Sequence, residues 1–395
     1  MLALISHRTS FWDELTDHPE VIWGALLAAL IVILLTPAVG GMARLIGAVD
    51  EPGGRRLHKR PIPRLGGLAL FFGVLVPALA FLHLDSQMRA ILLGAAVATT
   101  VGAVDDFRGL RWFEKLAGQI AAAAVVCWAG VWVHKFTFPI LGVQHLPRPL
   151  GIGLTMLGIV AVMNMVNFLD GLDGLAAGVC AISALSFTVI GLSRGDINAA
   201  ILSAVVFGAC LGFLRHNFYP ARIFMGDSGA LLLGFTLAAV SVQGLSKTAA
   251  LAGLVLPLLV LAIPLIDTSF VVAKRIKHGR PVYVADRTHL HHRFQNIGFS
   301  QRRSVVYLYA WCGILALAAL ATRFVHPHPG TTEHHGHLSR AHWDAAGLAI
   351  DAAIGLLAVA ASAYVVYLLE IVKLANPFIR RRVEEGRDEE ARQTA

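Results

Sequence analysis

The chain has 395 residues, of which 56% are hydrophobic and only 15% are charged, and its mean hydropathy is +0.66. A soluble domain carries about 25% charged residues, so this composition excludes an ordinary soluble enzyme or binding protein. The apolar runs are continuous rather than alternating, which argues against a transmembrane β-barrel. The net charge of +8 is typical of cytoplasmic loops that meet anionic lipid, so we expect a lipid bilayer and no nucleic acid as partner.

Eleven apolar segments approach the length of about 20 residues that a helix needs to cross a bilayer. We therefore expect an all-α, polytopic integral membrane protein. Residues 21–372 would form one helical bundle, and residues 373–395 a charged cytoplasmic tail. The predicted spans are 21–46, 66–84, 88–104, 116–133, 150–168, 175–193, 197–214, 229–245, 248–273, 304–324 and 345–372.

Basic residues predict the orientation of these spans, because cytoplasmic loops are enriched in Lys and Arg. Most of the Lys and Arg residues lie in five segments, all on the same side of the predicted spans. This side is predicted to be the cytoplasm, with the N-terminus outside. The basic segments are 48–65, 105–115, 215–228, 274–303 and 373–395.

The first polar segment, residues 50–67, is dense in proline, glycine and basic residues. Its prolines and glycines predict a rigid loop ahead of the second span. A rigid loop that carries His58, Lys59 and Arg64 suits phosphate binding. The alternative is a basic loop that only faces lipid headgroups.

Two adjacent acids, Asp105 and Asp106, close the third span. Neighbours on a helix point about 100° apart, so they do not share one face. We expect Asp106 to bind a metal and Asp105 to meet a lipid phosphate. The alternative is a pair that is merely exposed to water at a helix end. Lys115 would contact a lipid phosphate at headgroup level, or be an ordinary snorkelling lysine.

The strongest signal is a polar residue at every third position of an apolar run: Asn164, Asn167, Asp170 and Asp173. Carboxylates at membrane depth each cost several kcal/mol, so their presence calls for a function. Intervening glycines let the backbone break and approach a ligand. Hydrogen bonding between helices would explain the two asparagines but not the two aspartates. We therefore expect all four to bind substrate.

Residues 217–229 lead into the eighth span and include Asn217, Phe224 and Asp227. Asp227 suits an exposed oxygen ligand for Mg²⁺, an ion that takes one or two carboxylates plus substrate phosphates. Phe224 suits stacking on a base. The alternative is that Asp227 only caps the following helix.

The largest predicted cytoplasmic loop carries His289, His291, His292 and Arg293. Zinc binding is disfavoured, because Cys ligands are absent and the spacing is not HExxH. Imidazoles and a guanidinium suit a diphosphate better. The alternative is a solvated basic loop. Six further histidines, between residues 326 and 342, fall on a predicted outer loop and receive no role.

These five motif segments, in this order and on one predicted face, resemble the polyprenyl-phosphate N-acetylhexosamine-1-phosphate transferases. The resemblance covers roughly residues 40–300. It implies that a lipid phosphate attacks the β-phosphate of a UDP-sugar and releases UMP. It also implies a need for Mg²⁺, or Mn²⁺ in its place, and a possible homodimer. The family's metal aspartate corresponds to Asp227, its aspartate pair to Asp105 and Asp106, its nucleotide-site residues to Asn167, Asp170, Asp173, Asn217 and Phe224, and its diphosphate-facing histidines to His289, His291 and His292.

The His-Leu-His-His run at 289–292 and the expected eleven spans resemble the GlcNAc-1-phosphate branch of this family. We therefore expect transfer of GlcNAc-1-phosphate to undecaprenyl phosphate at the cytoplasmic face of a bacterial inner membrane. This reaction would start a cell-envelope glycan such as lipopolysaccharide or teichoic acid.

The sequence leaves three other functions to consider. The nearest is the phospho-MurNAc-pentapeptide translocase of the same family. A secondary transporter is disfavoured, because the acids lie at span ends and no repeat is visible. A CDP-alcohol phosphotransferase would need an arginine and later aspartates that do not follow residues 170–177.

Overall fold

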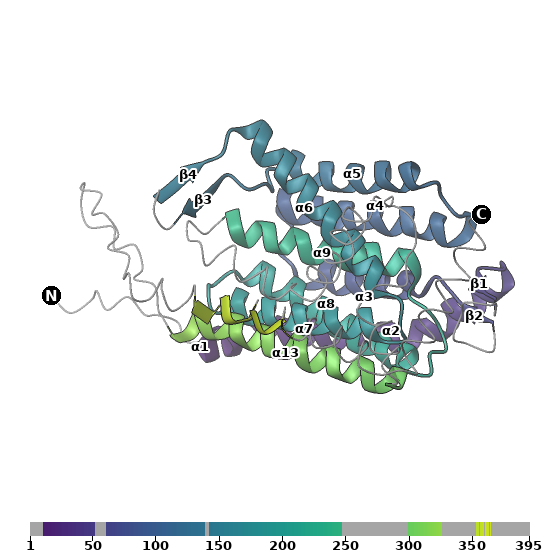
Figure 1. Ribbon diagram of the computed structural model, residues 1–395. Coiled ribbons are helices and arrows are strands. Elements are labelled where there is room, and N and C mark those ends of the chain that lie inside the picture. Colours follow the sequence, from purple (N-terminus) through teal and green to yellow (C-terminus); the bar gives the residue numbers. More distant parts are fainter. Residues whose placement is uncertain are drawn as a thin grey trace.

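The structure is a computed structural model that describes residues 11–51, 61–138, 142–246 and 299–325, with isolated helical positions between 353 and 364. These residues form a bundle of α-helices with two short hairpins at its ends (Figure 1). The helices are α1 (Phe11–Asp17), α2 (Glu20–Leu45), α3 (Gly66–Phe81), α4 (Ser86–Arg108), α5 (Trp112–Trp128), α6 (Arg148–Leu169), α7 (Leu175–Leu192), α8 (Ile197–Asn217), α9 (Gly226–Ser246) and α13 (Gln301–Val325).

Nine of the predicted spans correspond to helices α2 to α9 and α13. Six helices in the described ranges are long and apolar enough to cross a membrane: α2, α4, α6, α7, α8 and α13. Helix α3 is apolar but only 16 residues long. The predicted spans 248–273 and 345–372 lie outside the described ranges, apart from the isolated positions near 360. The multi-pass helical architecture is therefore confirmed, whereas the number eleven stays a prediction.

Two antiparallel hairpins were not predicted. Strand β1 (Val49–Asp50) pairs with β2 (Ile62–Pro63), and β3 (Lys135–Phe138) pairs with β4 (Gly142–His145). Strands of two and four residues are too short to show a period in the sequence. The β1–β2 pair, extended by a hydrogen bond from the Arg64 amide to the Ala48 carbonyl (2.9 Å), fixes the chain just before α3.

Helix α2 shows how neighbouring helices compensate for a proline. Pro37 lies inside α2 and has no N–H, so the carbonyl of Ile33 lacks its helical partner. His216, near the end of α8, places Nε2 at 3.1 Å from that carbonyl oxygen. Because the carbonyl can only accept, Nε2 is the donor. The bond ties the end of α8 to the middle of α2.

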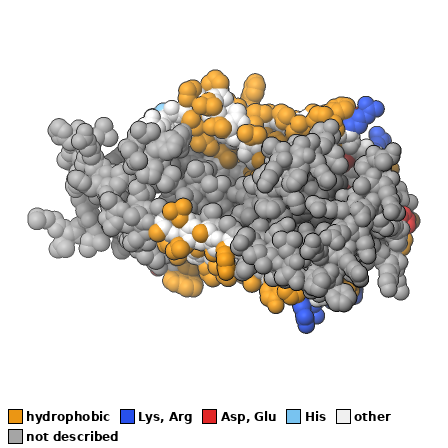
Figure 2. Space-filling view, in the orientation of Figure 1, with side chains coloured by type: hydrophobic (Ala, Val, Ile, Leu, Met, Phe, Trp, Pro, Cys, Tyr) orange, Lys and Arg blue, Asp and Glu red, His pale blue; other side chains and the backbone are white. Residues whose placement is uncertain are grey.

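Helix α9 lies inside the bundle and contacts α3, α4, α6, α7 and α8. Its Leu231, Leu232 and Phe235 are fully buried. In contrast, the outer faces of α2 and other peripheral helices expose large apolar side chains, among them Leu26, Leu30 and Leu34. Figure 2 shows such apolar side chains along the flanks of the molecule, and Lys and Arg toward the end that carries β1 and β2. This distribution suits a bundle surrounded by lipid with a charged end in water.

Candidate active site

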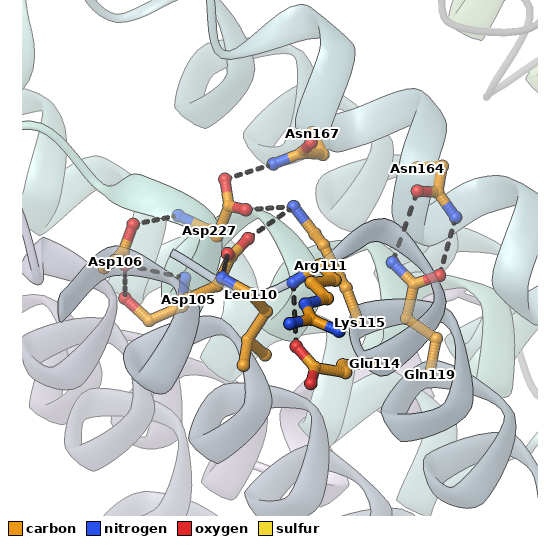
Figure 3. Close-up of polar contacts among 11 residues, drawn as sticks. Asp105, Asp106, Leu110, Arg111, Glu114, Lys115, Gln119, Asn164, Asn167 and Asp227 are labelled. Atoms are coloured by element: carbon orange, nitrogen blue, oxygen red, sulfur yellow. Dashed lines mark hydrogen bonds and ion pairs between the residues drawn. The ribbon is translucent and has the colours of Figure 1, made fainter. Parts of the chain in front are cut away.

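Four helix ends bring the predicted polar residues together at one end of the bundle. Helices α4 and α6 end there, whereas α5 and α9 begin there. The ends carry Asp105 and Asp106 (α4), Lys115 (α5), Asn167 (α6) and Asp227 (α9), whose side chains converge (Figure 3). Residues from three of the five motif segments, carried by four helices, therefore form one cluster.

Lys115 links two carboxylates from different helices. Its Nζ lies 2.9 Å from Asp105 Oδ2 and also contacts Asp227 Oδ2. Desolvation by itself would lower the pKa of Lys115, but the charges and hydrogen bonds of Asp227 and Asp105 outweigh it and raise the pKa. The side chain is only 18% exposed. Lys115 is therefore a cation held between two anions, unlike a snorkelling lysine whose ammonium lies in water.

Asp227 also binds Asn167 from α6. Asn167 Nδ2 donates to Asp227 Oδ1 (2.6 Å). Because Lys115 binds Oδ2, both carboxylate oxygens of Asp227 have partners. Asp227, Asp105 and the amide of Asn167 supply hard oxygen donors, the type that Mg²⁺ prefers. In the described ranges, no group of three or more His, Cys, Asp or Glu residues could hold a metal. A magnesium site that relies on substrate phosphates does not need such a group.

The two adjacent acids make different contacts, as their positions on a helix predict. Asp105 Oδ1 accepts the Leu110 N–H (2.6 Å) at the turn between α4 and α5, and Oδ2 faces Lys115. Asp106 Oδ1 accepts the Asp227 N–H (2.8 Å), and Oδ2 accepts the N–H (3.0 Å) and hydroxyl (2.8 Å) of Ser228. Asp105 thus faces the cation, whereas Asp106 faces the backbone of α9.

Asn217 and Asp173 join two loops. Asn217 is 1% exposed. Its Oδ1 accepts the Gly174 N–H (3.0 Å), and its Nδ2 donates to the Ile223 carbonyl (2.9 Å). Asp173 Oδ2 accepts the Ala221 N–H (2.9 Å). Both residues were predicted to bind substrate. Both polar atoms of the Asn217 amide are hydrogen-bonded within the protein. Asn217 therefore acts on the site by holding the two loops in place.

Asp170 follows the last residue of α6 and is half-buried. Burial raises the pKa of its carboxyl well above the usual value, and the charges of Asp227, Asp106 and Asp173 raise it further. The charge of Arg64 opposes this rise. Asp170 therefore lies within the electrostatic field of the cluster.

Asn164 makes the interhelical hydrogen bonds that were the alternative to substrate binding. Its Nδ2 donates to Gln119 Oε1 (2.8 Å), and Gln119 Nε2 donates back to Asn164 Oδ1 (3.2 Å). Nδ2 also contacts the Val160 carbonyl of the same helix (2.8 Å). This reciprocal amide pair joins α5 to α6 about one turn from Asn167 (Figure 3).

Arg64 and Phe224 lie on segments that pack together. Arg64 forms an ion pair with the buried Asp50 of β1. The Phe224 N–H donates to the Pro63 carbonyl (2.9 Å), and the Phe224 carbonyl accepts the Gly66 N–H (3.0 Å). The backbone of Phe224 is therefore fixed, whereas its ring is half-buried.

The remaining predicted residues, His58, Lys59, His289, His291, His292 and Arg293, lie outside the described ranges. Two further residues, Gln119 and Tyr309, support the site. Gln119 is a lone amide in an apolar span, a signal that could have been noticed. Tyr309 of α13 donates its hydroxyl to the Gly174 carbonyl, and nothing in the local sequence announces this contact.

Known proteins match this chain over most of its length. The profile of glycosyl transferase family 4 matches residues 88–245. The chain is 36% identical over 305 residues to the probable undecaprenyl-phosphate N-acetylglucosaminyl 1-phosphate transferase of Bacillus subtilis, covering 77% of this chain and 85% of the relative. It is 40% identical over 333 residues to the decaprenyl-phosphate N-acetylglucosaminephosphotransferase of Mycobacterium leprae, covering 76% and 83%. It is 34% identical over 296 residues to the phospho-N-acetylmuramoyl-pentapeptide-transferase of Desulforudis audaxviator, covering 68% and 86%.

Proposed function

Because the chain belongs to glycosyl transferase family 4, we propose that it transfers GlcNAc-1-phosphate from UDP-GlcNAc to undecaprenyl phosphate. The relatives at 36% and 40% identity carry this activity in their names, with undecaprenyl or decaprenyl phosphate as acceptor. The observation that best supports this proposal is that four polar side chains converge at one end of the bundle: Asp105, Lys115, Asn167 and Asp227. Charged groups at that position can meet a water-soluble nucleotide and the phosphate of a lipid that stays in the bilayer.

The reaction exchanges one phosphoanhydride for another. An oxygen of the lipid phosphate forms a bond to the β-phosphorus of UDP-GlcNAc. The bond from that phosphorus to the oxygen that bridges the α- and β-phosphates breaks, and UMP leaves with the bridging oxygen. No ATP is needed. Two phosphorylated reactants repel each other, so catalysis depends mainly on positive charge and positioning.

Lys115 is positioned to supply such charge. Its ammonium lies between Asp105 and Asp227, which fixes a positive charge at the cluster. A carboxylate repels a phosphate, so Asp105 contributes by orienting Lys115. A lipid phosphate is already largely ionised near neutral pH and has little need of a general base.

The side-chain oxygens of Asp227 and Asn167 fit Mg²⁺, with Mn²⁺ as a substitute. When bound, the ion neutralises charge on the diphosphate. Asp227 would hold it through its carboxylate and Asn167 through its amide oxygen, while the NH₂ group of Asn167 donates to Asp227 Oδ1. His289, His291 and His292 are proposed to face the same diphosphate.

The active site is proposed to lie on the cytoplasmic side of a bacterial inner membrane. The basic residues in segments 48–65, 105–115 and 215–228 support this orientation, because Lys and Arg accumulate in cytoplasmic loops. A cytoplasmic site has direct access to the nucleotide sugar.

The test is a substrate panel. Purified protein is incubated with undecaprenyl phosphate, Mg²⁺ and either UDP-GlcNAc or UDP-MurNAc-pentapeptide, and UMP is measured. We expect UMP from UDP-GlcNAc. Release only from UDP-MurNAc-pentapeptide would move the chain to the translocase branch, and release from neither would reject both assignments.

A further inference from the structure

Asp106 fastens the first turn of α9, the turn that carries Asp227. The first N–H groups of a helix have no partner within that helix. Here the N–H groups of Asp227 and Ser228 both donate to the Asp106 carboxylate of α4, and the Ser228 hydroxyl donates as well. Asp106 therefore caps α9 from a different helix (Figure 3), and its negative charge lies at the positive end of the α9 dipole.

Glycines leave this turn no space to shift. A Cβ on Gly102, one turn before Asp106 on α4, would lie 2.4 Å from the Asp227 carbonyl oxygen. A Cβ on Gly67 of α3 would lie 2.0 Å from the Gly229 nitrogen. Gly226 has a φ of +68°, and a Cβ there would lie 2.4 Å from Asp106 Oδ2. The first turn of α9 is thus held by hydrogen bonds to Asp106 of α4 and by close backbone contacts with Gly102 of α4 and Gly67 of α3.

We propose that Asp106 is a positioning residue, and that it acts by fixing the Asp227 carboxylate between Lys115 and Asn167. Three hydrogen bonds from α9 occupy both Asp106 oxygens and leave about one of the four lone-pair positions of the carboxylate, on Oδ1, for any other partner. This inference rests on the proposed function and revises the expectation that Asp106 binds the metal. A displacement of about 1 Å at a reacting centre can cost about a hundredfold in rate, which gives such a cap its importance.

Three variants separate positioning from metal binding. Asp106→Asn keeps the shape but places an NH₂ group among the donors of α9. Ser228→Ala removes the hydroxyl bond to Asp106 Oδ2, together with the 3.2 Å contact of the same hydroxyl to the Met225 carbonyl, without changing any carboxylate. Asp227→Asn is the reference for loss of the proposed ligand. Each purified protein is measured by amide hydrogen exchange of residues 227–230, by Mn²⁺ binding in electron paramagnetic resonance without substrate, and by kcat.

We expect exchange to be about tenfold faster in Asp106→Asn, because a cap stabilises the first turn by roughly that factor. Ser228→Ala should change exchange in the same direction by a smaller factor, and kcat should fall in the same order. Mn²⁺ binding should weaken by no more than about threefold in Asp106→Asn and in Ser228→Ala. Neither variant removes the proposed ligand, and each acts on the ion only through the charge of Asp106 or the position of Asp227. Asp227→Asn should weaken Mn²⁺ binding far more.

The inference is overturned if Asp106→Asn weakens Mn²⁺ binding as much as Asp227→Asn does. It is equally overturned if exchange at residues 227–230 stays at the wild-type rate in Asp106→Asn, or if faster exchange in Ser228→Ala leaves kcat unchanged. Hydrogen exchange and Mn²⁺ binding need no substrate. A wild-type protein that releases no UMP would therefore reject the proposed function while these measurements still report on Asp106.

Discussion

Lys115 and Asp227 are 112 positions apart in the sequence, and their side chains form an ion pair at the meeting point of α5 and α9. Asp105 binds the same ammonium from α4. This contact joins two motifs of the predicted set into one electrostatic unit. It also makes the Lys115 ammonium and a divalent cation competitors for the same Asp227 oxygen.

Removing Lys115 should therefore separate catalysis from metal affinity. We expect Lys115→Met to lower kcat by about 10²–10³-fold, the usual loss for a charge aimed at a reacting group. The same variant should bind Mn²⁺ more tightly, because the ammonium no longer occupies Asp227. Turnover and Mn²⁺ titration measure the two effects, with Lys115→Arg as the charge-keeping control. Weaker Mn²⁺ binding in Lys115→Met would contradict the competition.

Asp227→Asn should abolish turnover without unfolding the protein. A magnesium site with few protein ligands loses most of its affinity with one carboxylate. Helical circular dichroism should be unchanged, whereas raised Mg²⁺ should not restore activity. Near-normal turnover at ordinary Mg²⁺ would rule out Asp227 as the ligand.

Asn217 and Asn167 should differ although both are asparagines near the site. Asn217→Ala leaves the Gly174 N–H and the Ile223 carbonyl without their partner, a cost of about 1–3 kcal/mol for each buried group. We expect a lower unfolding temperature together with lower activity. Asn167→Ala should lower kcat with little change in unfolding temperature. A stable Asn217→Ala protein with an isolated rise in the KM for UDP-GlcNAc would instead assign Asn217 to the nucleotide.

The orientation is tested by cysteine labelling. In a background without the four native cysteines, a cysteine at Arg111, an exposed position between α4 and α5, should react only after the inner membrane is made permeable. A cysteine at the exposed His145 of β4 should react in intact cells. The opposite pattern would invert the topology.

The sequence predicted helices α2 to α9 and α13 well, because apolar runs of about 20 residues have few other structures in a membrane. The seven-residue helix α1 has no such run and was not predicted. The 100° offset between adjacent helical residues also predicted that Asp105 and Asp106 make different contacts. These are local properties of a helix. The two-residue strands β1 and β2 carry no comparable signal.

Partners across helices could not be read from the sequence. Nothing in the sequence near Asn164 indicates that Gln119 binds it. Nothing near Asn217 indicates that its side-chain amide forms hydrogen bonds to Gly174 and Ile223. The capping role of Asp106 depends on where α9 begins in space, which hydrophobic patterns do not specify. Motif residues thus identify the site, whereas the division into contacting and supporting residues requires the fold.

The most direct measurement of the central claim follows the phosphorus atom. Purified protein is given undecaprenyl phosphate, Mg²⁺ and UDP-GlcNAc labelled with ³²P at the β-phosphate, and the lipid and water phases are separated. The account predicts that the label enters the lipid as a diphosphate-linked sugar and that the released nucleotide is unlabelled UMP. Label that leaves in UDP, with sugar alone joined to the lipid, would contradict it.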